Sequence, residues 1–418
     1  MSFAVGFTGS VFALSLSGLL LYRVLTELYR PSPVNTLVLS PVPSQWRRKA
    51  LTLTLMFLLS RVVIYLLAWY LSGRDPAAFR EALVGGDCEH YIYLAQNGYT
   101  SVGEEAKLIV FYPLYPLLIR FVMLLVPDAF VSGVIISNVC TFGACLTLFR
   151  WVWEESDADR ALTSVLLMLL YPFSMFTLSC YTEGLFLFLS LLCVYSARRG
   201  RFLRCAVFGF LAALTRTQGL LLFIPSIYEW WIRLRDRIKA PGFFAPFSVI
   251  NASDARQGLS LLLIPAGFAV FLGLNTYYFH DPFAFFAFEA APPWYQGIAF
   301  FGNNLSEHIQ CAKSWPYLAD IIYIPQVVLF FAVCGVVLFG LLTQCRTSLL
   351  LYAMVYLLVS YSASWLISGA RYLFADFPIY IILAIGIKKA RNRIVLILVM
   401  IPFMAYYLLH YLLNYAIM

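Results

Sequence analysis

The sequence between residues 198 and 239 reads RRGRFLRCAVFGFLAALTRTQGLLLFIPSIYEWWIRLRDRIK, and this stretch decides the fold. Two arginine clusters enclose a largely apolar segment, which the polar run Thr215–Gly219 interrupts near its middle. Lys and Arg gather in the cytoplasmic links of membrane proteins, so both clusters are expected on one membrane face. The chain between them must therefore enter the membrane and return to the same side.

Each arm of this segment is shorter than the roughly 20 residues that a full membrane span requires. The pattern therefore predicts two half-helices that meet at a polar break. Backbone without helical hydrogen bonds is tolerated at membrane depth only where it lines a cavity or is buried in protein. Arg216, which lies in the break, is thus a candidate site residue.

The composition of the whole chain supports a membrane protein. Of its 418 residues, 62% are hydrophobic and only 12% are charged, whereas soluble domains carry about 25% charged residues. Apolar stretches recur from end to end, which predicts an all-α, polytopic transmembrane bundle rather than a soluble domain on one anchor. The net charge of +8 comes from Lys and Arg in short links, so we expect no nucleic-acid partner.

Ten apolar stretches are predicted to cross the membrane, and this routing puts every strong basic cluster on one face. Residues 1–49 are predicted to form an extra span with a proline-rich cytoplasmic connector, and residues 50–418 the main transmembrane domain. Residues 111–126 favour a helix at the outer interface, with a full span as the alternative. The predicted spans are residues 3–22, 51–71, 130–149, 161–178, 184–197, 258–279, 321–342, 349–367, 373–387 and 394–416.

The outer loop that follows residue 73 carries an acidic cluster with Asp87, Glu89 and His90. Residues 88–96 are predicted to form an interfacial helix that ends at Asn97-Gly98, with Asp87 at its N-cap position. Paired carboxylates also suit general-base catalysis, so capping and catalysis both explain Asp87. Glu104, Glu105 and Lys107 are interpreted as a solvated loop tip.

Three further charged residues lie at the outer ends of apolar segments. Glu183 lies either at the interface or in a site. Arg216 and Arg371 are expected on the same face as Asp87, where two guanidinium groups would suit a phosphate.

Cysteine and histidine give weaker signals. The nine cysteines contain no CxxC pair, and a disulfide between Cys88 and Cys311 is an open alternative because both lie in outer segments. His90, His280 and His308 also lie outside, but no pair has ligand spacing. A bound divalent metal is therefore left open, and no cofactor is firmly expected.

Several short motifs follow one another in a fixed order along the chain. They are Asp87-Cys88-Glu89-His90-Tyr91 with Ala95-Gln96-Asn97-Gly98-Tyr99, Phe111-Tyr112-Pro113-Leu114-Tyr115-Pro116, Tyr171-Pro172-Phe173-Ser174 with Tyr181-Thr182-Glu183-Gly184-Leu185-Phe186, Ala212–Gly219, and Ala370-Arg371-Tyr372. Taken together, these motifs resemble those of the GT-C superfamily of membrane glycosyltransferases, and within it the GPI mannosyltransferase 2 (PIG-V) family and its prokaryotic relatives. One position departs from the pattern, because Gly86 stands where the family commonly has Trp beside the acid.

The resemblance implies transfer of a mannosyl or other hexosyl group from a polyprenyl- or dolichyl-phosphate donor, the co-substrate, to a lipid-linked or glycan acceptor at the outer or luminal face. Asp87 is the residue carried over as the catalytic base. The short loops favour a bacterial plasma membrane, with the endoplasmic reticulum membrane as the alternative. The residues expected to bind substrate are Glu89, His90, Glu183, Arg216, Arg371 and Tyr372.

Two other functions compete with glycosyl transfer. The broken helix and the arginines within apolar segments are also typical of a polytopic transporter or lipid flippase, although no internal repeat is visible. The missing Trp at position 86 raises a third hypothesis, a non-catalytic subunit that retains the GT-C fold.

Overall fold

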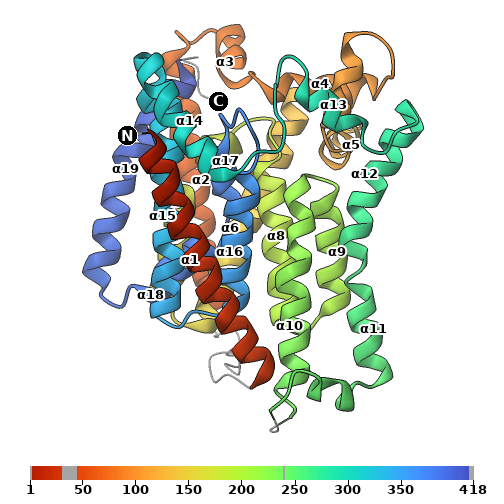
Figure 1. The fold of residues 1–418 in the computed structure, drawn as a ribbon. Helices are drawn as coiled ribbons and strands as arrows, with labels where there is room; N and C mark the ends of the chain where they lie inside the picture. The colour runs from red at the N-terminus through yellow and green to blue at the C-terminus, as the bar shows by residue number, and fades with distance from the viewer. Residues whose placement is uncertain (1, 31–44, 239–240, 414–418) are drawn as a thin grey trace.

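The computed structural model describes residues 2–30, 45–238 and 241–413, and within these ranges the chain is all-helical and contains no strand. The helices run side by side as a bundle (Figure 1), which confirms the predicted class. Most of the predicted connector, residues 31–44, lies outside the described residues, as does the end of the last predicted span. Six described segments are long and apolar enough to cross a membrane: α1 (Ser2–Tyr29), α2 (Trp46–Leu71), α6 (Ala129–Glu155), α11 (Ala252–Ser260) with α12 (Leu263–Phe279), Pro316–Leu342 with α15 (Ile324–Leu342), and α19 (Ala390–Leu412).

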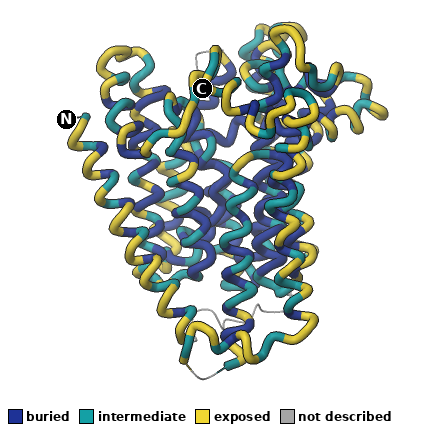
Figure 2. The backbone as a smooth tube through the Cα atoms, turned by 45° about the vertical axis from the view of Figure 1, so that its right-hand side comes forward, coloured by how far each residue is buried: buried dark blue, intermediate teal, exposed yellow. Residues whose placement is uncertain are grey.

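The outer helices of the bundle expose apolar side chains. Leu55, Leu59, Val62 and Leu66 follow one face of α2 and are all more than half exposed. Buried residues fill the middle of the bundle, whereas exposed ones line its sides (Figure 2). Such a continuous apolar surface is unfavourable in water, so these faces are suited to lipid. The chain is therefore a multi-pass membrane protein.

The two ends of the bundle differ in the way the basic clusters predict. Basic links follow α15 and the shorter helices α8, α10 and α18, and these links lie at the lower end in Figure 1. The two segments predicted to lie outside, residues 74–126 (the first outer segment) and 280–317 (the second outer segment), cover the upper end. The shorter helices are α7 (Ala158–Leu169), α8 (Glu183–Arg198), α9 (Phe202–Ala213), α10 (Phe223–Arg235), α16 (Thr347–Ser360), α17 (Gly369–Tyr372) and α18 (Pro378–Gly386). The outer segments form α3 (Pro76–Leu83), α4 (Asp87–Asn97), η1 (Glu104–Val110), α5 (Leu114–Val122), α13 (Ala284–Ala290) and α14 (Phe301–Ser314).

The segment between the two arginine clusters is broken, as predicted. Helices α9 and α10 are separated by residues 214–216 and by the helical turn η3 (Thr217–Leu222). The backbone N–H of Leu114, which begins α5, donates a hydrogen bond of 3.0 Å to the carbonyl of Leu214. This bond satisfies a carbonyl that the break removes from the helical ladder, and it joins the break to the first outer segment.

Gly219 allows η3 to fold back against α9. A Cβ atom at this position would overlap the backbone of Ala212 and Ala213. We expect Gly219→Ala to lower the stability by about 1–3 kcal/mol, because backbone cannot yield as a side chain can. Gly335→Ala in α15 is the control, since open space surrounds that Cβ position. Unfolding in mixed micelles tests both; equal stabilities for the two variants would contradict this packing.

Several predicted spans are wrong in length. Helix α7 ends at Leu169 instead of continuing to Leu178, and α16 ends at Ser360. The predicted span 373–387 is bent by 66° between two short helices. The non-helical carbonyls find side-chain donors: Tyr65 donates to Leu178 at 2.6 Å. Tertiary hydrogen bonds of this kind replace helical ones at membrane depth.

Two further predictions concern residues 111–126 and the extra N-terminal span. Helix α5 has 9 residues, about 14 Å at 1.5 Å per residue, so residues 111–126 do not form a full span. It lies at the upper end of the bundle, where the interfacial helix was expected (Figure 1). Helix α1 packs against α14 and α15, and Arg23 near its end donates a hydrogen bond of 2.7 Å to the carbonyl of Cys345.

Candidate active site

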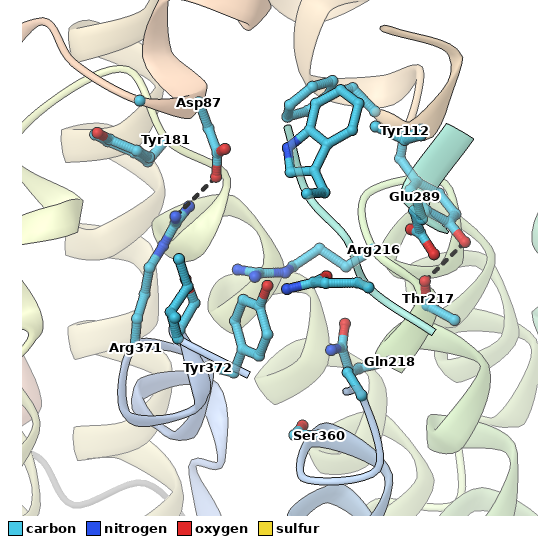
Figure 3. A pocket seen from close by; sticks show the side chains of 18 of the residues that line it. Asp87, Tyr112, Tyr181, Arg216, Thr217, Gln218, Glu289, Ser360, Arg371 and Tyr372 are labelled. Atoms are coloured by element: carbon cyan, nitrogen blue, oxygen red, sulfur yellow. Dashed lines mark hydrogen bonds and ion pairs between the residues drawn. The ribbon is translucent and has the colours of Figure 1, made fainter. Parts of the chain in front are cut away.

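A cavity of about 730 Å³ lies below the outer segments, where the bundle helices end. Its volume is in the range of small-molecule sites, about 300–1,000 Å³. Residues from every motif group of the sequence line it (Figure 3). They include Asp87, Tyr91, Phe111, Tyr112, Tyr181, Thr215, Arg216, Thr217, Gln218, Arg371 and Tyr372.

Asp87 is not the N-cap of α4. Gly86 holds that position with φ 51° and ψ −128°, and Asp87 is the first helical residue. No side chain caps this helix. Instead, the carboxylate of Asp87 forms an ion pair of 2.7 Å with Nη1 of Arg371. The predicted capping role is therefore wrong, and the carboxylate is instead held by an arginine of the cavity lining.

The same backbone conformation explains the departure at position 86. A positive φ combined with this ψ is accessible to glycine and strained for residues that have a Cβ atom. Glycine at this position therefore follows from the way the chain enters α4. The hydroxyl of Tyr181 fixes the entry by donating a hydrogen bond of 2.6 Å to the carbonyl of Gly85.

Glu183 links the two arginines of the site. Its Oε1 lies 2.6 Å from Nε of Arg371 and 2.8 Å from Nη1 of Arg216. The side chain of Glu183 is fully buried at the start of α8, so its charge is compensated by the arginines instead of by water. Asp87, Arg371, Glu183 and Arg216 thus form one connected chain of charges, which we call the charge network.

Aromatic rings hold the two guanidinium groups in place. Arg371 lies over the rings of Phe176 and Tyr181, at 4.5 and 4.8 Å from their centroids. Arg216 lies 4.8 Å from the ring centroid of Tyr372. Such contacts favour a cation that is partly removed from water. The arginines are therefore positioned before any ligand binds.

Hydrogen bonds between the motif segments assemble this site. Tyr112 and Thr217 join the first outer segment to η3 with a bond of 2.9 Å between their hydroxyls. Tyr171 donates a bond of 2.8 Å to the carbonyl of Ala370, next to Arg371. These tyrosines explain why motifs far apart in the sequence meet at one cavity.

The structure separates the predicted site residues into groups. Asp87, Arg216, Arg371 and Tyr372 line the cavity. Glu183 lies behind the two arginines and does not line it. The structure does not bring the remaining two residues into the cavity lining: Glu89 is exposed on α4, and His90 packs against Phe111 and Trp294, with ring centroids 5.1 and 6.2 Å apart.

Glu289 on α13 is a cavity residue that the sequence reasoning missed. Burial raises the pKa of its carboxyl to about 7. Gln218 and Trp294 also line the cavity. A usable signal existed, because Glu289 is the one acidic residue within residues 283–301, a run that is rich in Phe.

The cysteines and histidines form no centre of their own. Cys88 and Cys311 are free thiols, so the disulfide alternative is wrong; Cys88 is buried, with its sulfur 3.9 Å from Oγ of Ser179. His280 follows α12, and His308 is buried on α14. In the described ranges, no three His, Cys, Asp or Glu side chains group as a metal site.

The charge network suits an anionic ligand with a reacting hydroxyl beside it. The side chain of Arg216 is 11% exposed, and among the described residues its guanidinium group donates one hydrogen bond, to Glu183. Its remaining N–H groups are available to a ligand in the cavity. Asp87 is 30% exposed and can accept a proton there.

In comparisons with known proteins, no family model matches this sequence, and no curated protein sequence matches it.

Proposed function

We propose that this protein is a membrane glycosyltransferase that moves a mannosyl or other hexosyl group from a polyprenyl- or dolichyl-phosphate donor to a lipid-linked or glycan acceptor at the outer or luminal face. The observation that carries the proposal is the charge network, which joins a carboxylate at the cavity to two fixed guanidinium groups. The resemblance of the motifs to GT-C enzymes of the PIG-V type points in the same direction.

In the proposed reaction, the acceptor hydroxyl attacks the anomeric carbon of the donor. Asp87 takes the proton of that hydroxyl, and the bond between the anomeric carbon and the phosphate oxygen breaks. The electron pair of this bond leaves with the polyprenyl phosphate. Attack opposite the leaving group inverts the anomeric centre, so a β-linked donor gives an α-linked product.

The ion pair between Asp87 and Arg371 couples the two halves of this step. When Asp87 becomes protonated, Arg371 loses one of its two anionic partners. Its positive charge is then less compensated at the moment when negative charge grows on the departing phosphate. An interaction that strengthens only in the transition state accelerates the reaction.

The cavity also has apolar lining residues. Among them, Val359 and Ile367 suit the first units of the prenyl chain.

The experiment places the purified protein in liposomes with a polyprenyl-phosphate donor whose hexose is radiolabelled. Membrane lipid extract supplies acceptors. Glycosyl transfer predicts that the label leaves the donor and that polyprenyl phosphate appears. A flippase would move the intact donor across the bilayer, and a non-catalytic subunit would bind it without turnover. Either of these outcomes contradicts the proposed function.

Arg216 is expected to contribute directly to donor affinity. We expect Arg216→Gln to weaken the binding of polyprenyl phosphate about 10- to 100-fold, which corresponds to the loss of a charge-assisted hydrogen bond. Arg74→Gln is the control, because Arg74 is exposed and lies outside the cavity lining. Equilibrium binding of a labelled polyprenyl phosphate measures both; an affinity unchanged in Arg216→Gln would remove Arg216 from the phosphate site.

A further inference from the structure

The cavity has two chemically different walls. Figure 3 shows Asp87 and Arg371 on one side, Glu289, Tyr112 and Thr217 on the other, and Arg216 between them. The first wall contains most of the charge network. The second wall has no cation at hydrogen-bond distance of Glu289 within the described residues. A ligand that spans the cavity therefore meets cationic groups at one end and hydrogen-bonding groups at the other.

Glu289 lines this second wall without a partner of its own. Among the described residues, its carboxyl makes no hydrogen bond and no ion pair. Burial brings its pKa to about 7, so near neutral pH both the protonated and the ionised forms are present. The protonated carboxyl can donate one hydrogen bond and accept others, as a hydroxyl-rich ligand requires.

Two more lining residues bring a polar amide and an aromatic ring to the same cavity. Gln218 on η3 lines the cavity, and its side-chain amide has no hydrogen-bond partner in the described ranges. Trp294 lines the cavity as well, and edge contacts with Phe111 and His90 hold its indole ring, at centroid distances of 5.9 and 6.2 Å. His90 therefore packs on a residue of the cavity lining without lining the cavity itself.

We propose that Glu289, Gln218 and Trp294 form the subsite for the hexosyl group of the donor. Glu289 and Gln218 hydrogen-bond the sugar hydroxyls, and the indole of Trp294 packs against the apolar edge of the ring. A site of few polar groups among aromatic side chains fixes the orientation of its ligand. This subsite rests on the proposed function, because it takes the sugar whose phosphate the arginines hold.

The test compares two probes on the full-length protein in nanodiscs: polyprenyl phosphate, and the same lipid carrying a mannosyl group. Glu289→Ala is expected to weaken the binding of the mannosylated lipid about tenfold, the effect of one to two lost hydrogen bonds. The affinity for polyprenyl phosphate should stay within about twofold, since that probe lacks the sugar. Arg216→Gln should weaken both probes.

Two controls separate this effect from damage to the fold. Glu104→Ala removes an exposed carboxylate of η1 outside the cavity lining and should change neither affinity. Glu289→Gln keeps a donor and an acceptor and should recover most of the lost affinity. The subsite is overturned if Glu289→Ala weakens both probes equally or neither, while the wild type binds both. If the wild type binds neither probe, the proposed function fails and the subsite fails with it.

Discussion

Asp87→Asn is expected to lower the rate of sugar transfer by about 10²- to 10⁴-fold, the usual contribution of a general base. The amide has nearly the same shape as the carboxylate but cannot take the proton of the acceptor hydroxyl. Affinity for the donor should change far less than the rate, because Arg216 keeps its place over Tyr372. Single-turnover transfer from a labelled donor measures the rate, and equilibrium binding measures the affinity.

The matched control is Glu89→Gln, two residues further along α4. Glu89 is exposed and does not line the cavity, so its loss should leave transfer within about twofold of the wild type, as for a surface residue. If Asp87→Asn retained wild-type transfer, Asp87 would not be the base. Equal losses in both variants would instead point to the charge of α4 as a whole.

Arg371→Met is expected to give the second large effect, a loss of about 3–5 kcal/mol in the free energy of unfolding. Arg371 bridges Asp87 and Glu183, and its removal leaves the fully buried Glu183 paired, among the described residues, with Arg216 alone. Breaking a buried ion pair is costly because a poorly compensated charge stays behind. Unfolding in mixed micelles measures the change, and transfer activity should be lost as well.

A double variant distinguishes this mechanism from lost packing. Glu183→Gln in the Arg371→Met background should recover part of the stability, because it removes the stranded charge. Arg80→Met is the matched control: its partner Asp128 is exposed at 38%, so breaking that pair should cost at most about 1 kcal/mol. If the double variant were less stable than Arg371→Met, electrostatic compensation by Glu183 would be the wrong explanation.

The features that could be predicted from the sequence depend on local patterns. Two basic clusters too close together for two full spans predicted the break that contains Arg216, and Asn97-Gly98 predicted the end of α4. The glycine at that end has φ 80°, which glycine adopts readily. The same pattern put Arg216 and Arg371 at the outer ends of apolar segments, where the structure brings them to one cavity.

The features that the sequence did not predict depend on tertiary contacts. The N-cap of α4 was misplaced by one residue, because the positive φ of Gly86 has no signature in the side-chain pattern. Glu183 fitted an interface as well as a site until its two arginine partners were known. The early ends of α7 and α16 depend on donors from distant segments, such as Asn304, whose amide donates 2.7 Å bonds to the carbonyls of Tyr361 and Ala363.

Glu289 shows the same dependence. Helix α13 packs against η1 and thereby carries Glu289 over the cavity that the first outer segment helps to form. The two outer segments are far apart in the sequence, and periodicity within either one says nothing about their packing. Its place as the one acidic residue in the Phe-rich run 283–301 was the signal that could have identified it.

The most direct test of the central claim is a structure of the protein with a polyprenyl-phosphate hexose bound. The charge network predicts that the donor phosphate lies within hydrogen-bond distance of Arg216 and Arg371, with the anomeric carbon facing Asp87. The hexosyl ring should then extend toward Glu289. A donor bound with its phosphate outside this cavity, or with the sugar turned away from Asp87, would contradict the account.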